Sequence, residues 1–381
     1  MEFVLSEEHE QLRDGVRAFL QEKSPPTEVR RLMDGPDAYD EAVWKQMAEE
    51  LQLQALHIPE EYGGQGFSFA ELGIVLEEMG RVLLVAPYFA SVCLAANAIM
   101  NAGTEAQRVK FLPELASGAL IGTLAVTEPH DRAGHQATVT MPATSSGGDW
   151  MLNGTKTFVI DGHRADIIVV AARVSDDDGG VRLFVVDGDA EGLTRTPLAT
   201  MDLTRNQARL DFHDVAATPL GDSGRSERAL ARTLDQAVVC LANEMVGGAQ
   251  RVLEMAVEYA KIRVQFGRPI GSFQAIKHKC ADMLVGAECM KSVAMHAAWV
   301  AAHEPDQLAI NASLAKAYVS DGYFRVATDN IQIHGGIGFT WEHDAHLYFK
   351  RAKSSALLFG DSTYHRRLLA AELNLARGDA Q

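Results

Sequence analysis

The sequence lacks long apolar runs, spaced metal ligands and an excess of basic residues. No stretch approaches the roughly 18 consecutive apolar residues of a membrane-spanning helix. Residues 1–21 include several acidic side chains and no long apolar core, so they do not resemble a secretory signal. The formal net charge of −16 argues against a nucleic-acid-binding protein or a basic membrane-surface protein. We therefore expect a cytoplasmic protein with no membrane span and no nucleic-acid partner.

Cysteine and histidine are present, but not with the spacing that disulfide scaffolds or metal sites require. Cys93, Cys240, Cys280 and Cys289 form no C-x-x-C pair, and the 13 histidines form no H-E-x-x-H motif. A chain of 381 residues can bury a core large enough to need no disulfide. We expect free thiols and no metal centre.

The apolar pattern divides the chain into thirds. Residues 1–119 repeat apolar side chains at helical spacing, and Ser6 is a suitable N-cap for the first helix. Residues 120–225 contain short β-rich runs separated by Gly and Asp clusters, which predict an antiparallel barrel or sandwich. Residues 226–381 return to long helical periods, including one helix over 308–334 and another from about Ser362. The pattern predicts an α+β fold with three domains: 1–119, 120–225 and 226–381.

Four short segments are more distinctive than the composition. They are Ala125–Pro129, Arg263–Gln274, Ile331–Phe339 and Leu357–Thr363. Taken singly they are weak signals, because Gly335-Gly336, for example, also suits an ordinary helix C-cap. In this order and spacing they resemble the flavin-dependent acyl-CoA dehydrogenases, and the resemblance covers nearly the whole chain.

The resemblance implies an N-terminal helical domain, a central β domain and a C-terminal four-helix bundle. It further implies an enzyme that binds FAD, acts on an acyl-CoA thioester and passes electrons to an electron-transfer flavoprotein. In the family, the residues matching Arg263 and Phe266 meet the pyrophosphate and adenine of a FAD held mostly by the neighbouring subunit. A guanidinium suits a pyrophosphate, and an aromatic face suits adenine. The expected FAD-binding residues are Thr127, Phe158, Val159, Ile160, Arg263, Phe266, Phe273, Gln274, Gln332, Gly335, Gly336 and Ser362.

The residue that should remove the substrate proton is missing. In the commonest branch of the family a Glu matching Gly360 is this base, and in a second branch, which includes isovaleryl-CoA dehydrogenase, the base matches Ala237. Gly360 still supplies a backbone N–H, which in the family helps to polarise the thioester carbonyl. If only the carboxylate is missing, Gly360→Glu should restore some activity.

Two other family features are also replaced. The family's Gly-Ser-Asp stretch, which touches the cofactor or CoA, reads Arg132-Ala133-Gly134 here, and its Trp-Ile-Thr strand reads Phe158-Val159-Ile160. The second change removes the Thr hydroxyl expected at flavin N5, although a backbone N–H can still reach that atom.

Two carboxylates remain as substitutes for the base. Glu244 lies seven residues beyond Ala237 on the same helix, so it faces the same way about 10 Å further along. Three interpretations stay open: a buried Glu paired with an Arg or a partner subunit, a residue that shapes the acyl pocket, or the base. Asp361 adjoins the empty base position, but it precedes a helical run and is better explained as an N-cap.

These departures favour one subunit of a heteromeric acyl-CoA dehydrogenase, in which a homologous partner chain supplies the base. One alternative is a self-sufficient homotetramer with Glu244 as the base. Another is a flavin oxidase or monooxygenase relative, or a structural subunit without turnover of its own.

Overall fold

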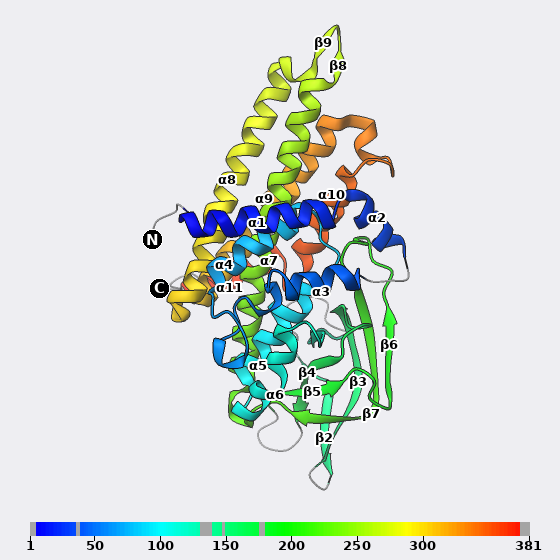
Figure 1. Ribbon diagram of the computed structural model, residues 1–381, viewed down its shortest axis with the longest axis vertical. Coiled ribbons are helices and arrows are strands. Elements are labelled where there is room, and N and C mark those ends of the chain that lie inside the picture. The colour runs from blue at the N-terminus through cyan, green and yellow to red at the C-terminus, as the bar shows by residue number, and fades with distance from the viewer. Residues whose placement is uncertain (1–4, 36–38, 130–138, 147–148, 175–179, 374–381) are drawn as a thin grey trace, which may run out of the picture. The chain divides into compact units, whose positions relative to one another are not determined.

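The computed structural model describes residues 5–35, 39–129, 139–146, 149–174 and 180–373 (Figure 1). The expected departure at Arg132-Ala133-Gly134 lies outside these residues. Within the described parts, no helix is both long enough and apolar enough to cross a membrane. The chain forms two compact units, one of residues 1–31, 69–84 and 238–381, and one of residues 32–68 and 85–237. The domain divisions expected after residues 119 and 225 stay predictions.

The first unit is helical. Its helices are α1 (Glu7–Lys23), α4 (Phe69–Arg81), α7 (Ser226–Ile262) from Val238 onward, α8 (Gln274–His303), α9 (Leu308–His334), α10 (Ala345–Leu357) and α11 (Ser362–Glu372). Helix α9 packs against α8, α10 and α11, and α4 packs against α1 and α8. In Figure 1, α8 and α9 run side by side, and the hairpin of β8 (Val264–Gln265) and β9 (Arg268–Pro269) lies at one end of the unit.

Local signals in the sequence set several of these helix ends. The Ser6 side chain accepts a hydrogen bond from the His9 N–H at the start of α1, as expected of an N-cap. Asp361 caps α11 in the same way, because its side chain accepts from the Tyr364 N–H at 2.8 Å. Helix α9 ends at Gly335, whose φ of 65° suits a residue without a Cβ. The helices expected over 308–334 and from Ser362 are confirmed.

The second unit contains the β domain. Its strands are β1 (Gly122–Ala125), β2 (Pro142–Ser146), β3 (Asp149–Ile160), β4 (Ile167–Val174), β5 (Val181–Asp187), β6 (Leu193–Pro197) and β7 (Gln207–Pro219). The strands form a barrel. Its pairings run in the order β4, β2, β3, β7 and β5, and β5 pairs back with β4 to close the circuit. Most pairings are antiparallel, as expected, but β1–β4 and β2–β4 are parallel. Apolar side chains such as Ile168, Phe184 and Phe212 fill the interior.

Helices account for the rest of the second unit. They are α3 (Glu41–Glu49), the π-helical segment η3 (Phe89–Ala96), α5 (Asn97–Ala102), α6 (Glu105–Ala116) and the first part of α7. Segment η3 packs against β1 and α5. Helix α2 (Pro26–Asp34) crosses the boundary between the units.

Helices α4 and α7 approach each other at two glycines. A Cβ at Gly247 would lie 1.7 Å from the Glu77 carbonyl oxygen, and one at Gly80 would lie 1.9 Å from the Glu244 carbonyl oxygen. These contacts are with backbone atoms, which cannot rotate away as a side chain could. The two glycines therefore set the distance between the helices and fix the backbone of α7 at Glu244.

We expect Gly247→Ala to lower the free energy of unfolding by about 1–3 kcal/mol or more, because the new methyl group forces α4 and α7 apart. Urea unfolding measures this change. Gly15→Ala is the matched control, since Gly15 is an exposed helical glycine with no atom within 4 Å of its would-be Cβ. Gly15→Ala should be neutral or slightly stabilising. Equal unfolding midpoints for the two variants would contradict the close approach.

Candidate functional site

The β8–β9 hairpin presents an aromatic and a cationic side chain to solvent. Its turn residues Phe266 and Gly267 both have positive φ, 54° and 75°, as a tight two-residue hairpin turn requires. Phe266 is 91% exposed, and its ring lies 6.0 Å from that of Phe273. The Arg268 guanidinium lies 4.1 Å from the centre of the Phe273 ring. An exposed aromatic residue in a left-handed conformation is unfavourable by itself, which suggests that another molecule covers it.

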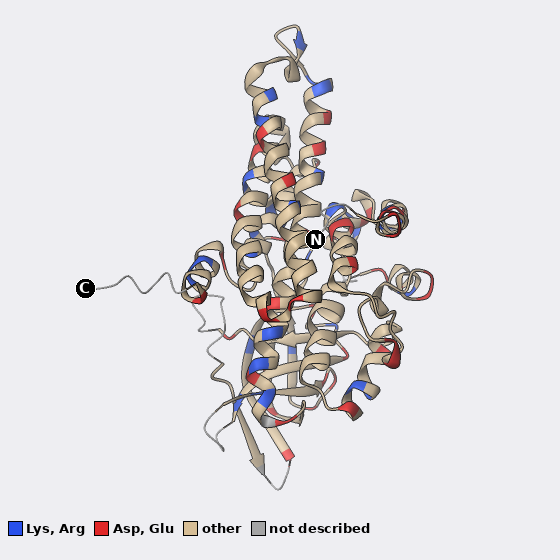
Figure 2. Ribbon diagram, turned by 90° about the vertical axis from the view of Figure 1, so that its left-hand side faces the viewer, with Lys and Arg blue, Asp and Glu red and all other residues tan. Residues whose placement is uncertain are grey.

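The end of α9 offers a second open surface in the same unit. Gln332, Gly335 and Gly336 are exposed, and a Cβ at either glycine would meet no atom within 4 Å. The His334 ring stacks on Tyr259 of α7 at 4.3 Å, which ties the end of α9 to the last turn before Arg263. The structure thus joins two expected FAD-binding segments that are about 70 residues apart in sequence. Basic residues, drawn blue in Figure 2, mark the hairpin end of the helices.

These features fit the adenine half of FAD. An exposed aromatic face suits adenine, basic side chains suit a pyrophosphate, and uncovered glycines allow close approach to backbone N–H groups. Arg263 and Gln274 are also exposed at this end. The side chains of Arg263, Phe266 and Gln274 are thus exposed, as the expectation of a FAD shared with a neighbouring subunit requires.

The expected flavin-side residues lie in the second unit, on and beside strand β3. The β3–β7 pairing shifts between Lys156 and Val159, and Phe158 within this bulge has a φ of 54° and a side chain 53% exposed. The side chains of Val159 and Ile160 are only 2% and 3% exposed, and Val159 belongs to the apolar core of the barrel. These two residues therefore offer a ligand chiefly their backbone, and their expected part in FAD binding stays a prediction.

A buried ion pair fixes this part of the β domain, and no motif in the sequence predicted it. The Lys156 ammonium donates to a Glu128 carboxylate oxygen at 2.8 Å and to the Val126 carbonyl oxygen at 3.0 Å. Glu128 also accepts from the Thr140 and Met141 N–H groups, at 3.0 and 2.9 Å.

The surroundings of this ion pair shift the pKa of both partners. Burial lowers the pKa of Lys156 to about 8, although the bond to Glu128 opposes this change. Burial alone would raise the pKa of Glu128, but Lys156 and Thr140 bring it below its ordinary value. The pair holds the Thr127 segment against β3, where the Thr157 N–H donates to the Thr127 carbonyl at 2.9 Å.

At the empty base position there is no room for a side chain. Gly360 has a φ of 103°, and a Cβ there would lie 2.5 Å from Tyr364 Cδ1 and 3.0 Å from His365 Nε2. Within the described residues, no group accepts a hydrogen bond from the Gly360 N–H, although the residue is buried. The other position at which the resemblance places a base, Ala237, is fully buried on α7. Ser362 follows as the first residue of α11 and is partly buried.

Glu244 is held in an ion pair. Its carboxylate accepts from Arg351 Nη1 of α10 at 2.5 Å, and the two side chains are 9% and 4% exposed. This contact corresponds to the first of the three sequence interpretations, a buried Glu paired with an Arg. The sequence did not identify Arg351, because α10 was not predicted and the pair spans 107 positions.

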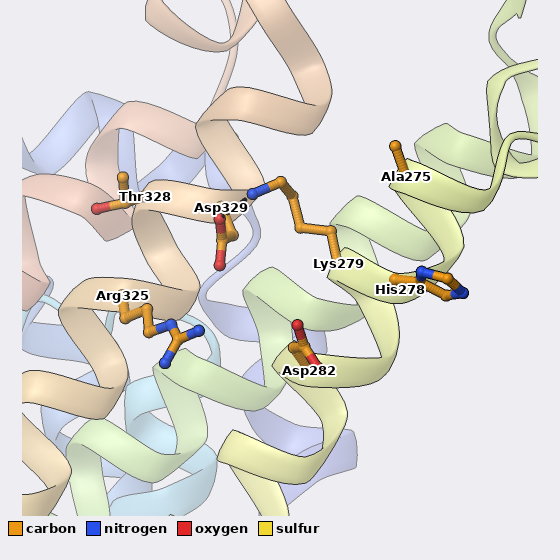
Figure 3. A pocket seen from close by; sticks show the side chains of 7 residues that line it. All are labelled: Ala275, His278, Lys279, Asp282, Arg325, Thr328 and Asp329. Atoms are coloured by element: carbon orange, nitrogen blue, oxygen red, sulfur yellow. Dashed lines mark hydrogen bonds and ion pairs between the residues drawn. The ribbon is translucent and has the colours of Figure 1, made fainter.

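A shallow hollow between α8 and α9 has a volume of about 350 Å³ and lies one to two turns from Gln274 and Gln332 (Figure 3). Its lining residues are Ala275, His278, Lys279, Asp282, Arg325, Thr328 and Asp329. Lys279 donates to Asp329 at 2.6 Å across it. This charged lining of both signs does not suit an acyl chain, which binds in apolar pockets.

Comparison with known proteins identifies the family. Models of the acyl-CoA dehydrogenase N-terminal, middle and C-terminal domains match residues 6–119, 123–215 and 227–374. The chain is 36% identical over 377 residues to acyl-CoA dehydrogenase IpdE2 of Mycolicibacterium smegmatis, covering 97% of this chain and 100% of the relative.

Solved structures agree in fold over the full length. Butyryl-CoA dehydrogenase from Megasphaera elsdenii superposes with a TM-score of 0.91 at 29% identity, covering 98% of this chain and 100% of that one. The ChsE4–ChsE5 complex from Mycobacterium tuberculosis gives a TM-score of 0.88 at 27% identity, covering 100% of both chains. The expected fold of helical, β-rich and helical domains is confirmed. The chain belongs to the acyl-CoA dehydrogenase family of FAD-dependent oxidoreductases that act on acyl-CoA.

Proposed function

We propose that this chain is one subunit of a heteromeric acyl-CoA dehydrogenase and that a homologous partner chain supplies the catalytic base. The surroundings of Gly360 are the observation that carries the proposal. Tyr364 and His365 lie where the Cβ of a base would be, so this position is built for glycine and is not merely missing a carboxylate. The ChsE4–ChsE5 relative, named as a complex of two chains, supports such an assembly.

The ion pair of Glu244 weakens the alternative of a self-sufficient homotetramer. The Glu244 carboxylate is engaged at 2.5 Å by the buried Arg351 guanidinium, so it is not free to approach an α-proton of a substrate. Its position also suits a structural role, because its own backbone carbonyl lies against Gly80. We assign Glu244 to the structure of the α7–α10 contact.

The chain's own residues then hold and orient, and they do not remove the proton. Bound FAD supplies the hydride acceptor for dehydrogenation of the carbon next to the enolising one. Arg263, Phe266 and Gln332 would hold the adenine half, together with Phe273, Gln274, Gly335 and Gly336. Thr127 and the backbone of residues 158–160, in the second unit, would hold the flavin half. Ser362, at the start of α11 in the first unit, is a further expected FAD-binding residue. The Gly360 N–H donates to the thioester carbonyl oxygen and stabilises negative charge there.

The test compares the isolated chain with the chain co-expressed with a homologous neighbour, using butanoyl-CoA and octanoyl-CoA and an electron-transfer flavoprotein or a dye as acceptor. We expect the isolated chain to turn over at least about 100-fold more slowly than the complex, because general-base catalysis contributes about 10²–10⁴-fold. The complex should bind FAD and regain ordinary turnover of about 1–100 s⁻¹.

Turnover at that rate by the isolated chain would overturn the proposal. Glu244→Gln, with Glu258→Gln as an exposed carboxylate control on the same helix, would then decide whether Glu244 is the base. Oxygen reactivity of the reduced flavin with ligand bound would separate an oxidase from a dehydrogenase.

A further inference from the structure

At the empty base position, two successive backbone carbonyl groups each accept a hydrogen bond from a side chain, one on α11 and the other on α9. Phe359 and Gly360 have positive φ values of 55° and 103°. The Phe359 carbonyl accepts from His365 Nε2 of α11 at 2.9 Å, and the Gly360 carbonyl accepts from Lys316 Nζ of α9 at 2.8 Å. The backbone on both sides of Gly360 is therefore fixed by side chains.

Both of these side chains are buried and fully engaged. Lys316 is 0% exposed, and its ammonium also donates to the Ala356 carbonyl at 3.0 Å and to Ser320 Oγ at 3.1 Å. The three N–H donors of a lysine ammonium thus each have an acceptor. His365 is 3% exposed, and its second ring nitrogen lies 3.3 Å from Ser313 Oγ.

Burial at this site is unfavourable for a lysine. Desolvation lowers the pKa of Lys316 to about 7, although Asp361 and Asp321 oppose this change. An apolar side chain would fill the same volume at lower cost. Unlike an apolar side chain, Lys316 donates hydrogen bonds that fix the carbonyl groups of Ala356 and Gly360.

The geometry of the peptide bond shows what the two contacts achieve. No peptide bond of the described residues is cis, and in a trans peptide the C=O and N–H point in opposite directions. With the Phe359 carbonyl turned toward His365, the Gly360 N–H points away from His365. That N–H has no acceptor among the described residues, and a buried donor without an acceptor is rare unless a ligand provides one.

We propose that Lys316 and His365 are positioning residues that aim the Gly360 N–H at the thioester carbonyl of the bound acyl-CoA. Glycine is the residue least able to hold a fixed conformation by itself, so its neighbours supply the constraint. The inference rests on the proposed function only for the statement that a thioester binds at Gly360. Lys316 and His365 act through the backbone and do not touch the substrate.

The probe is acetoacetyl-CoA bound to the FAD-loaded protein, with its partner chain where one is needed. This compound ionises to an enolate without help from an enzymatic base, so the absent carboxylate does not matter. A donor to the thioester oxygen stabilises the enolate, and the ultraviolet absorbance of the enolate measures its fraction as a function of pH. We expect wild-type protein to lower the midpoint pH of enolate formation relative to free acetoacetyl-CoA.

Removing either contact should reverse that effect. We expect Lys316→Met and His365→Phe each to raise the midpoint by about one pH unit, which is a tenfold loss of preference for the enolate. Lys316→Gln and His365→Gln retain an N–H donor and should recover part of the shift. Lys291→Met is the matched control, because Lys291 pairs with buried Glu77 on other elements of the same unit and should leave the midpoint unchanged.

The outcomes separate the two claims. If wild-type protein does not lower the midpoint, no thioester is polarised at Gly360, and that part of the proposed function fails. If wild-type protein lowers it and folded Lys316→Met and His365→Phe lower it equally, the positioning role is overturned. A shift of the same size in Lys291→Met would also overturn it, because the effect would then reflect general loosening. Where Lys316→Met does not fold, the His365→Phe and His365→Gln pair decides.

Discussion

Replacing Glu244 with glutamine should lower the free energy of unfolding by about 3–5 kcal/mol, because the change removes the Glu244 charge from its ion pair with the buried Arg351 guanidinium. The carboxylate and the amide have nearly the same shape, so the loss comes from charge and not from packing. Chemical unfolding of the FAD-loaded protein measures it. Turnover of the fraction that remains folded, assayed with the partner chain, should change little, since Glu244 has a structural role.

Two further variants define the origin of the effect. Glu258→Gln changes a largely exposed carboxylate of the same helix and should change stability by no more than about 0.5 kcal/mol. Glu244→Gln combined with Arg351→Met removes both charges and should recover much of the loss. A Glu244→Gln protein as stable as the wild type but without turnover would contradict the structural role and favour Glu244 as the base.

Introducing glutamate at position 360 should destabilise the protein by at least about 2 kcal/mol and should not raise turnover. The new Cβ would lie 2.5 Å from the Tyr364 ring, and the φ of 103° is one that residues with a side chain rarely adopt. From the sequence, a gain in activity was expected only on the condition that nothing but the carboxylate was missing. Gly360→Ala, which adds the Cβ alone, should account for most of the loss.

A second substitution separates steric exclusion from loss of the acyl site. Gly360→Glu with Tyr364→Ala gives the carboxylate room and should be the variant in which α-proton exchange of a short acyl-CoA rises, by tenfold or more. Gly286→Ala is the control, because its Cβ would make only an ordinary 3.7 Å contact with Val326. A stable, fully active Gly360→Glu single variant would show that Tyr364 and His365 do not occupy the base position.

Much of the fold follows from short-range patterns. Apolar side chains at helical spacing predicted α9 at its observed bounds, and a polar side chain before a helical run predicted the caps at Ser6 and Asp361. Such features depend on residues within three or four positions of one another, so they can be read from the sequence. The parallel pairings of β4 with β1 and β2 join strands about 30–45 residues apart, and no local pattern specifies them.

The candidate functional site also contains some features that short-range patterns predict and others that they do not. The expected FAD-binding segments could be named because each is a contiguous motif, whereas the bulge at Phe158 and the burial of the Val159 and Ile160 side chains depend on the pairing of β3 with β7. Arg351, Lys316 and His365 were not identified, because each acts on a residue from another helix or loop. The sequence names those residues, but it does not show how close each lies to the group that it contacts.

The sequence by itself determined the family, the helix–strand–helix order and the absence of a carboxylate at positions 237 and 360, since all three are properties of residues in a known order. Only the tertiary structure decided that Glu244 is held by Arg351 and that Tyr364 and His365 leave no room for a side chain at position 360. It also decided that the Gly360 backbone is fixed by Lys316 and His365. The physical reason is that charge pairing, steric exclusion and hydrogen-bond direction depend on separations of a few ångströms between groups that lie far apart along the chain.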